Sequence, residues 1–215
     1  MTNTEILGRV DHTLLKASAS WQEIKTLCDE ALRFKTASVC IPPCYVKPVF
    51  VEFGKSPVIC TVVGFPLGYS IPATKALETK QALDEGAFEI DMVINIGEVK
   101  NGNFSKISDE IGLLKNICGN KILKVIIETC FLSEEEKIRL CGIVTDAGAD
   151  FIKTSTGFGS SGATLADIEL FKKHIGPGVK IKAAGGIKTR EDMEMLINAG
   201  ADRIGSSSAV KLLSQ

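Results

Sequence analysis

Three segments of the chain repeat one pattern, in which a glycine and an alanine precede a short run rich in apolar residues. The segments begin at Gly86, Gly148 and Gly200. A glycine in the left-handed conformation commonly ends a helix, and the run after it predicts a β-strand. A chain that repeats this helix-to-strand connection alternates helices with strands, and such alternation is typical of parallel β/α folds.

The rest of the sequence extends this alternation. Strands are predicted at residues 10–15, 37–41, 58–63, 88–94, 122–127, 151–153, 180–183 and 203–205. Apolar periodicity and capping residues predict helices at 20–34, 45–53, 72–85, 104–118, 133–147, 165–174 and 191–199, with a helical turn at the C-terminus. The first strand is ambiguous by itself, and counting it gives eight. Eight units in 215 residues predict an α/β fold, a (β/α)8 TIM barrel in a single domain, 1–215.

Strand alternation assigns charged residues to the inside of this barrel. Equivalent isoleucines in the three repeats, namely Ile90, Ile152 and Ile204, are expected beneath the helices. The residues that follow them, Asp91, Lys153 and Gly205, then face the barrel mouth. Because a packed barrel interior is expected to be apolar, an acid and a base at these positions indicate a function.

Lys153 is the main candidate for catalysis. An ammonium group is costly to bury, so a lysine in an apolar strand either reaches water or is used as an amine. We interpret Lys153 as a Schiff-base nucleophile. Lys182, near the end of the next strand, would supply a positive charge that lowers the pKa of a neighbouring lysine, while Asp91 would stabilise Lys182 and shuttle protons. The alternative is that both lysines reach water and Asp91 pairs with one of them.

Glycines and serines follow the last two predicted strands, at the corner where barrels usually bind phosphate. These residues are Gly185, Gly186, Gly205, Ser206, Ser207 and Ser208, and ordinary turns are the alternative interpretation. Residues 157–162 match G-x-G-x-x-G, but a dinucleotide site would need an acid about twenty residues later, where this chain has the basic strand around Lys182. We therefore expect no NAD, and we expect these glycines to shape the loop beside Lys153.

Composition argues against several other classes of protein. The net charge of −1 gives no basic field for nucleic acid or membranes, and no apolar run could span a bilayer. A polar N-terminus and an odd number of cysteines, seven, favour a cytoplasmic protein with reduced thiols. The two histidines, His12 and His174, lie far apart and have no metal-ligand spacing, so no metal or other cofactor is expected. His174 is best explained as a charge at a helix C-terminus.

Several motifs together resemble the deoxyribose-phosphate aldolase family over residues 4–210. They are Asp11-His12-Thr13-Leu14-Leu15-Lys16, residues 60–68 (CTVVGFPLG), 89–95 (EIDMVIN), 124–129 (KVIIET), 151–159 (FIKTSTGFG) and 184–187 (AGGI). The resemblance implies a class I, metal-independent aldolase that cleaves 2-deoxy-D-ribose 5-phosphate to acetaldehyde and D-glyceraldehyde 3-phosphate in deoxyribonucleotide catabolism. It implies Lys153 as nucleophile and Lys182 with Asp91 for proton transfer. It also places Gly157, Gly185, Gly186, Gly205, Ser207 and Ser208 near the phosphate, and Thr13 and Cys40 near the substrate.

Three positions depart from familiar members of that family. Phe158 stands where some members have lysine, Lys188 replaces a common arginine, and the sequence ends at Gln215 without the longer tyrosine-ending tail of some members. These differences concern rate and affinity rather than the type of reaction. The alternatives are a transaldolase-like Schiff-base barrel and a barrel that binds a sugar phosphate without catalysis. Members of the family form homodimers or homotetramers, and the expected partners are the phosphorylated sugar and aldehydes.

Overall fold

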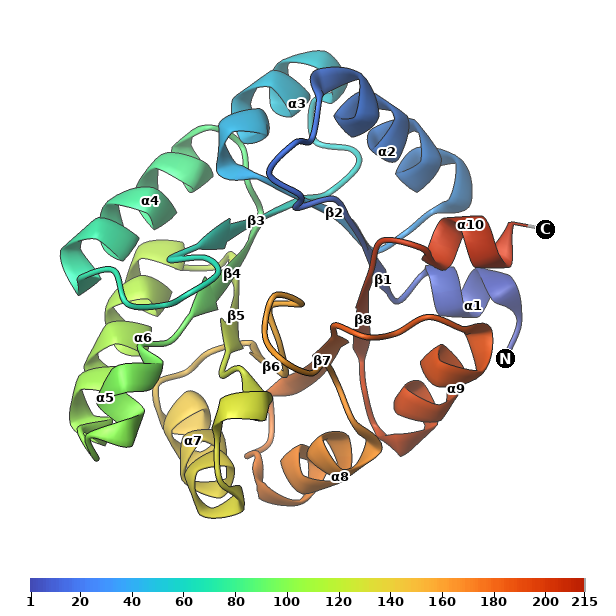
Figure 1. Cartoon of the computed structure of the whole chain (residues 1–215). Coiled ribbons are helices and arrows are strands. Elements are labelled where there is room, and N and C mark those ends of the chain that lie inside the picture. Colours follow the sequence, from blue (N-terminus) through green and yellow to red (C-terminus); the bar gives the residue numbers. More distant parts are fainter. Residues whose placement is uncertain (215) are drawn as a thin grey trace.

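The computed structural model describes residues 1–214, which form a closed barrel of eight parallel strands surrounded by helices (Figure 1). The strands are β1 (Val10–Thr13), β2 (Ser38–Ile41), β3 (Ile59–Val63), β4 (Glu89–Val93), β5 (Ile122–Ile126), β6 (Phe151–Lys153), β7 (Lys180–Ala184) and β8 (Arg203–Ser206). They lie in sequence order around the barrel, and β8 pairs with β1 to close it. The predicted (β/α)8 architecture is confirmed.

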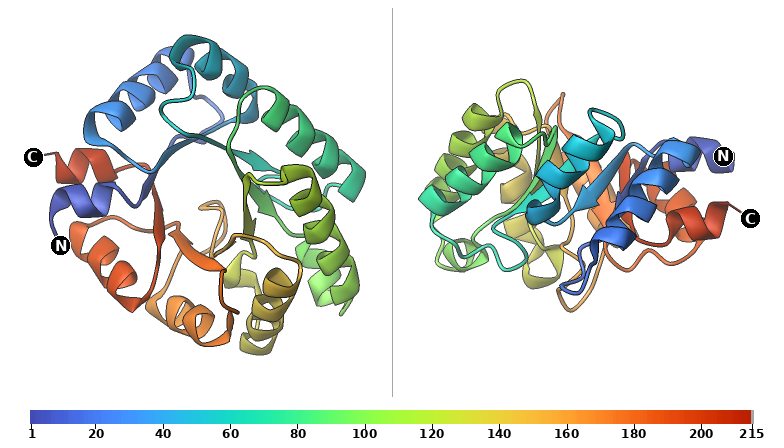
Figure 2. Two further views of the ribbon diagram at one scale, coloured as in Figure 1. Left: turned by 180° about the vertical axis from the view of Figure 1, so that it is seen from behind. Right: turned by 90° about the horizontal axis from the view of Figure 1, so that it is seen from above.

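Helices cover the outside of the barrel, as both views in Figure 2 show. They are α1 (Asn3–Leu7), α2 (Trp21–Phe34), α3 (Val46–Phe53), α4 (Pro72–Asp84), α5 (Ile96–Lys100), α6 (Phe104–Cys118), α7 (Glu134–Asp146), α8 (Leu165–His174), α9 (Arg190–Ala199) and α10 (Ala209–Leu213), with short 3-10 helices η1 (Pro43–Tyr45) and η2 (Thr129–Phe131). No helix in residues 1–214 combines the length and the hydropathy that a membrane span requires.

Capping residues identified from the sequence start two of these helices. The Ser20 hydroxyl accepts a hydrogen bond from the backbone N–H of Glu23 at the start of α2, and the Glu23 carboxylate accepts one from the backbone N–H of Ser20. Ser133 and Glu136 make the same reciprocal pair at the start of α7. Such pairs satisfy N–H groups that would otherwise lack partners, so they fix where each helix begins.

The three glycine-alanine repeats connect a helix to the following strand, as predicted. Gly86, Gly148 and Gly200 all have positive φ angles, of 115°, 75° and 127°, where a side chain would be strained. The equivalent isoleucines are fully buried in the apolar layer between the barrel and the helices, which agrees with the prediction: Ile90, Ile152 and Ile204. The residues that follow them therefore face the barrel axis.

The ambiguous first strand is real, although it ends at Thr13 rather than Leu15. Its identity depends on partners distant in the sequence, because Asp11 is aligned with Ser38 of β2 and with Gly205 of β8. Helices α1 and α5 were not predicted. Each has only five residues, too few to show a helical period in the sequence.

Candidate active site

The inside of the barrel is charged, and it contains more charged side chains than the two that strand alternation assigned to it. Seven ionisable side chains from six strands meet there: Asp11, Glu89, Asp91, Lys124, Lys153, Lys182 and Arg203. Burying charges this deeply is costly unless each one has a partner of opposite sign. Here each acid contacts at least two basic groups, which makes the interior one connected ion-pair network.

Asp91 joins the network together. Its Oδ2 atom accepts hydrogen bonds from Lys153 at 2.7 Å and from Lys182 at 2.6 Å. Its Oδ1 atom accepts a third from Lys124 at 2.8 Å. The side chain is fully buried, and Lys153 is only 3% exposed. Two lysines from neighbouring strands therefore share one carboxylate oxygen inside the barrel.

This arrangement sets the protonation states of Asp91 and Lys182. Burial alone would raise the pKa of Asp91, but the ammonium groups of Lys124, Lys153 and Lys182 hold it well below its ordinary range. Burial would also lower the pKa of Lys182, but the carboxylates of Asp11 and Asp91 outweigh it and raise that pKa. Asp91 is therefore an anion and Lys182 a cation at neutral pH.

Four members of the network were not assigned to the site from the sequence: Asp11, Glu89, Lys124 and Arg203. Lys124 lies 2.6 Å from Glu89 and also contacts Asp91. Burial alone would lower the pKa of Lys124, but the neighbouring acids outweigh it and raise that pKa well above its ordinary value. The signal was available, because Lys124 interrupts an apolar strand as Lys153 does. The same alternation argument, applied to β5, places Lys124 inside the barrel.

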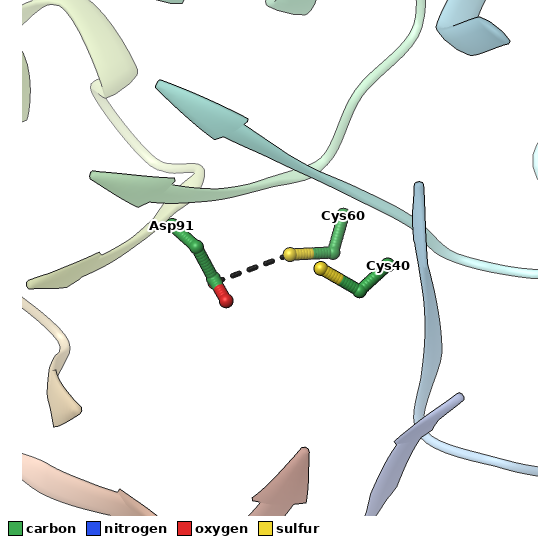
Figure 3. Close-up of side chains that lie close together, drawn as sticks. All are labelled: Cys40, Cys60 and Asp91. Atoms are coloured by element: carbon green, nitrogen blue, oxygen red, sulfur yellow. Dashed lines mark hydrogen bonds between the residues drawn. The ribbon is translucent and has the colours of Figure 1, made fainter. Parts of the chain in front are cut away.

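Two thiols lie beside the central carboxylate. Figure 3 shows the side chains of Cys40, Cys60 and Asp91 pointing toward one another, with the Cys60 thiol 3.2 Å from Asp91 Oδ1. Cys40 and Cys60 are aligned on β2 and β3, and both are fully buried. The hydrogen bond with Cys60 lowers the pKa of Cys40, whereas burial raises the pKa of Cys60 well above its ordinary value.

The chemistry of these side chains raises the question of a metal site. Cys40, Cys60 and Asp91, and likewise Asp11, Cys60 and Glu89, bring three donor atoms within 4.8 Å of one another. The carboxylates of both groups already bind basic side chains, and Lys124 lies 3.2 Å from the Cys60 sulfur. A metal cation there would be repelled by several like charges, so the arrangement favours amine chemistry.

The predicted phosphate loops meet through their backbones. A Cβ atom on Gly162 would lie 2.2 Å from the carbonyl oxygen of Gly185, and a Cβ atom on Gly185 would lie 3.4 Å from the Cα atom of Gly157. Among residues 1–214, the N–H groups of Gly157, Gly185 and Gly186 donate no hydrogen bond. Loops of this kind can direct bare N–H groups at an anion.

The remaining predicted residues lie on the adjacent strands and loops. Gly205 faces inward, because a Cβ atom there would come within 3.3 Å of the Lys182 side chain. Ser207 and Ser208 follow β8, where the Ser208 N–H donates to Ser206. Thr13 ends β1, aligned with Cys40, and its hydroxyl donates to the carbonyl of Asp11 at 2.7 Å. His174 ends α8, as predicted, and His12 faces outward to accept or donate a hydrogen bond with Glu30.

Comparison with known proteins decides the family. The model of the DeoC/LacD family of aldolases matches residues 6–210. The chain belongs to this aldolase family. A deoxyribose-phosphate aldolase of Clostridium botulinum (strain Eklund 17B / Type B) is 63% identical over 213 residues, which are 99% of this chain and 96% of the relative. Another from Clostridioides difficile (strain 630) is 57% identical over 209 residues, 97% of this chain and 95% of the relative.

A solved structure of a member of this family has the same fold. Deoxyribose phosphate aldolase from Aeropyrum pernix, described as having a unique tetrameric structure, is 30% identical and superposes with a TM-score of 0.90. The match covers 99% of this chain and 91% of that one. Family membership therefore holds over nearly the whole length of both proteins.

Proposed function

We propose that this protein, acting as one domain, is an aldehyde-lyase that reversibly cleaves 2-deoxy-D-ribose 5-phosphate to acetaldehyde and D-glyceraldehyde 3-phosphate. The observation that carries the proposal is the single oxygen of Asp91 shared by Lys153 and Lys182. The names of the relatives from two clostridial species support the choice of substrate. The reaction belongs to the breakdown of deoxyribonucleotides, as the resemblance implies.

Lys153 is the proposed nucleophile. Its neutral amine attacks the aldehyde carbon C1 of the open-chain sugar and forms a carbinolamine. Lys182 gives up a proton, which Asp91 relays to the carbinolamine hydroxyl. The hydroxyl leaves as water, and a protonated Schiff base remains. Asp91 Oδ2 accepts hydrogen bonds from both Lys153 and Lys182. This shared contact supports Asp91 and Lys182 as the proton-transfer pair.

The Schiff base then accepts the electrons of the bond that breaks. A base removes the proton of the C3 hydroxyl, C3 becomes the aldehyde of glyceraldehyde 3-phosphate, and the C2–C3 electron pair moves toward the iminium to form an enamine. Protonation of the enamine at C2 and addition of water to the iminium release acetaldehyde and regenerate the Lys153 amine. The base, Asp91 or a water molecule that it orients, works beside a fixed cation, Lys182.

Lys153 has fewer ion-pair partners than the other two lysines of the network. Among residues 1–214, four basic side chains face three carboxylates there. Lys153 pairs with one carboxylate only, whereas Lys182 pairs with two and Lys124 with three. Conversion of Lys153 to a Schiff base therefore disrupts the fewest ion pairs.

The predicted glycine loops would hold the phosphate end of the sugar. Gly157, Gly185 and Gly186 offer N–H groups without internal partners, and Gly205, Ser207 and Ser208 lie at the end of the next strand. Thr13 and Cys40 are aligned on β1 and β2, and β1 pairs with β8. In this proposal they lie close to the aldehyde end of the sugar. Backbone donors at the β7 and β8 ends are a usual phosphate site in barrels of this kind.

Borohydride trapping tests the nucleophile. Folded protein is incubated with acetaldehyde, reduced with borohydride, and mapped by peptide mass spectrometry. We expect an ethyl adduct on Lys153 that is absent from Lys153→Met, while Lys188→Met, a lysine outside the barrel interior, is modified at Lys153 as the wild type is. An adduct on Lys182 instead, or none from active enzyme, would overturn the assignment.

The finer points of assembly and location follow from the family. We propose a homodimer or homotetramer that works in the cytoplasm, with free thiols at all seven cysteines. The tetrameric structure of the Aeropyrum pernix relative supports an oligomer. Light scattering coupled to size-exclusion chromatography tests the oligomer, and a monomer at micromolar concentration would contradict it.

A further inference from the structure

Glu128 is a buried carboxylate that the mechanism does not use. It follows β5 after one residue, is 2% exposed, and has a left-handed backbone with a φ angle of 53°. A non-glycine residue in that conformation is strained, and a buried carboxylate is costly. Among residues 1–214, no basic side chain forms an ion pair with Glu128, and all the donors that its carboxylate accepts from belong to one residue, Thr156.

The contacts of Glu128 fix the turn after Lys153. Its carboxylate accepts hydrogen bonds from the backbone N–H of Thr156 at 3.1 Å and 3.3 Å, and from the Thr156 hydroxyl. The same hydroxyl accepts a hydrogen bond from the N–H of Phe158 at 3.0 Å. Gly157 lies between these two anchored residues, so its peptide group has a fixed direction.

Neighbouring contacts hold the same two loops together. The Thr129 N–H donates to the Thr154 carbonyl at 3.0 Å, and the Ile127 N–H donates to the Lys153 carbonyl at 3.1 Å. Gly159 packs against the carboxylate, because a Cβ atom there would come within 3.2 Å of Glu128. The segment after β5 therefore supports the segment after β6 on the side away from the β7 loop.

We propose that Glu128 is a positioning residue that holds the Thr156–Phe158 turn so that the Gly157 N–H faces the phosphate of the substrate. The inference rests on the proposed function and adds how this phosphate is recognised. A carboxylate suits this role because it accepts from the N–H and the hydroxyl of Thr156 together and leaves the Gly157 N–H free. In this proposal Glu128 acts through Thr156 and not by contact with the substrate.

The test compares the phosphorylated and the unphosphorylated sugar. For Glu128→Ala we expect kcat/KM for 2-deoxyribose 5-phosphate to fall by about tenfold or more, which is the loss of one or two hydrogen bonds, while kcat/KM for 2-deoxyribose changes by less than about threefold. Glu128→Gln keeps one acceptor for the Thr156 N–H, so we expect a smaller fall. Thermal melting checks that each variant is folded.

A matched control separates positioning from general destabilisation. Asp167→Asn changes another buried carboxylate, which binds Lys137 and the Thr164 hydroxyl at the start of α8, and we expect it to leave the ratio of the two kcat/KM values unchanged. An equal loss on both sugars for Glu128→Ala would overturn the proposal, as would unchanged kinetics.

Phosphate binding distinguishes this proposal from the proposed function. Titration calorimetry with inorganic phosphate needs no catalysis. If the folded wild type cleaved neither sugar but bound phosphate, and Glu128→Ala bound it about tenfold more weakly, the role of Glu128 would stand and the aldolase assignment would fall. Equal phosphate affinity in the two proteins would overturn the role of Glu128.

Discussion

At the residue scale, one carboxylate oxygen governs the proposed chemistry. Asp91 Oδ2 is within 2.7 Å of two lysine Nζ atoms. Among residues 1–214, only one of these lysines, Lys182, has a second acidic partner, Asp11. This difference divides the work between two identical functional groups. Lys182, with two acidic partners, is held as a cation. Lys153, with one, has fewer ion pairs to lose when it reacts.

Removal of the Lys182 charge tests that division. We expect Lys182→Met to lower kcat by at least about a hundredfold at neutral pH, because the proton donor beside the Schiff base is lost. Lys180→Met, on the exposed end of the same strand, is the control and should retain normal kcat. Normal kcat in Lys182→Met would show that the division is wrong.

Alternation along strands predicted Asp91, Lys153 and Lys182 as a group, because each is charged and lies in a strand that is otherwise mostly apolar. Lys124 satisfies the same rule, and it was missed because alternation was applied to the glycine-alanine repeats and not to β5. Glu128 gave no such signal. Its role depends on a left-handed backbone angle and on Thr156, which is 28 residues away in the sequence. Contacts of this kind follow from tertiary structure and not from any local pattern.

At the element scale, the longer helices and the strands after the first were predictable from apolar patterns and from the glycines or caps near their ends. The contacts between helices could not be predicted from the sequence. Helices α4 and α6 pack together through a buried ion pair in which Lys75 lies 2.9 Å from Glu110 and donates to the carbonyl of Val93 at 2.8 Å. That carbonyl ends the strand that carries Asp91.

Breaking this ion pair should weaken the contact between α4 and α6. Burial lowers the pKa of Lys75 and raises the pKa of Glu110, so each charge depends on the other. We expect Lys75→Met or Glu110→Leu alone to reduce the free energy of unfolding by about 3–5 kcal/mol, and the double variant to be much less destabilised than the sum. A urea-unfolding double-mutant cycle measures this coupling, and additive effects would contradict it.

At the scale of the whole molecule, the barrel is held together by apolar packing outside the sheet and by ion pairs within it. The core beneath the helices is a continuous layer that contains Ile90, Ile152 and Ile204. Hydrophobic periodicity predicted that layer well. The inner network depends on which strands become neighbours, and this is known only once the barrel closes through β1 and β8.

The inner network predicts a stability that falls in acid. The pKa values of Asp11 and Asp91 are held low by Lys124 and Lys182, although burial opposes this, so their stabilising contribution is present above their unfolded pKa of about 4 and is lost as the pH falls toward the folded values. The pKa of Lys182 is raised, so its contribution to stability is fully present below its unfolded pKa of about 10.5. That contribution is lost only as the pH rises toward the folded pKa.

Urea unfolding over a range of pH checks this expectation. The contribution of the network to the free energy of unfolding should be constant between about pH 5 and 9, and the measured stability should decrease steadily below about pH 4. Measurements at several salt concentrations separate this effect from surface charges, since buried pairs are screened little. Stability that stayed constant down to about pH 3 would contradict the paired state of Asp11 and Asp91.

The crossing of the β6 and β7 loops has a consequence for how this protein can evolve. Gly162 meets Gly185 through backbone atoms alone, with a carbonyl oxygen where a side chain would begin. Because neither glycine has a side chain, no mutation can make this contact smaller. Every substitution at either position adds atoms to it. Most contacts in a protein can drift through a series of similar residues. The contact between Gly162 and Gly185 allows no such series. We therefore expect relatives with other substrates to differ at other positions around the mouth of the barrel.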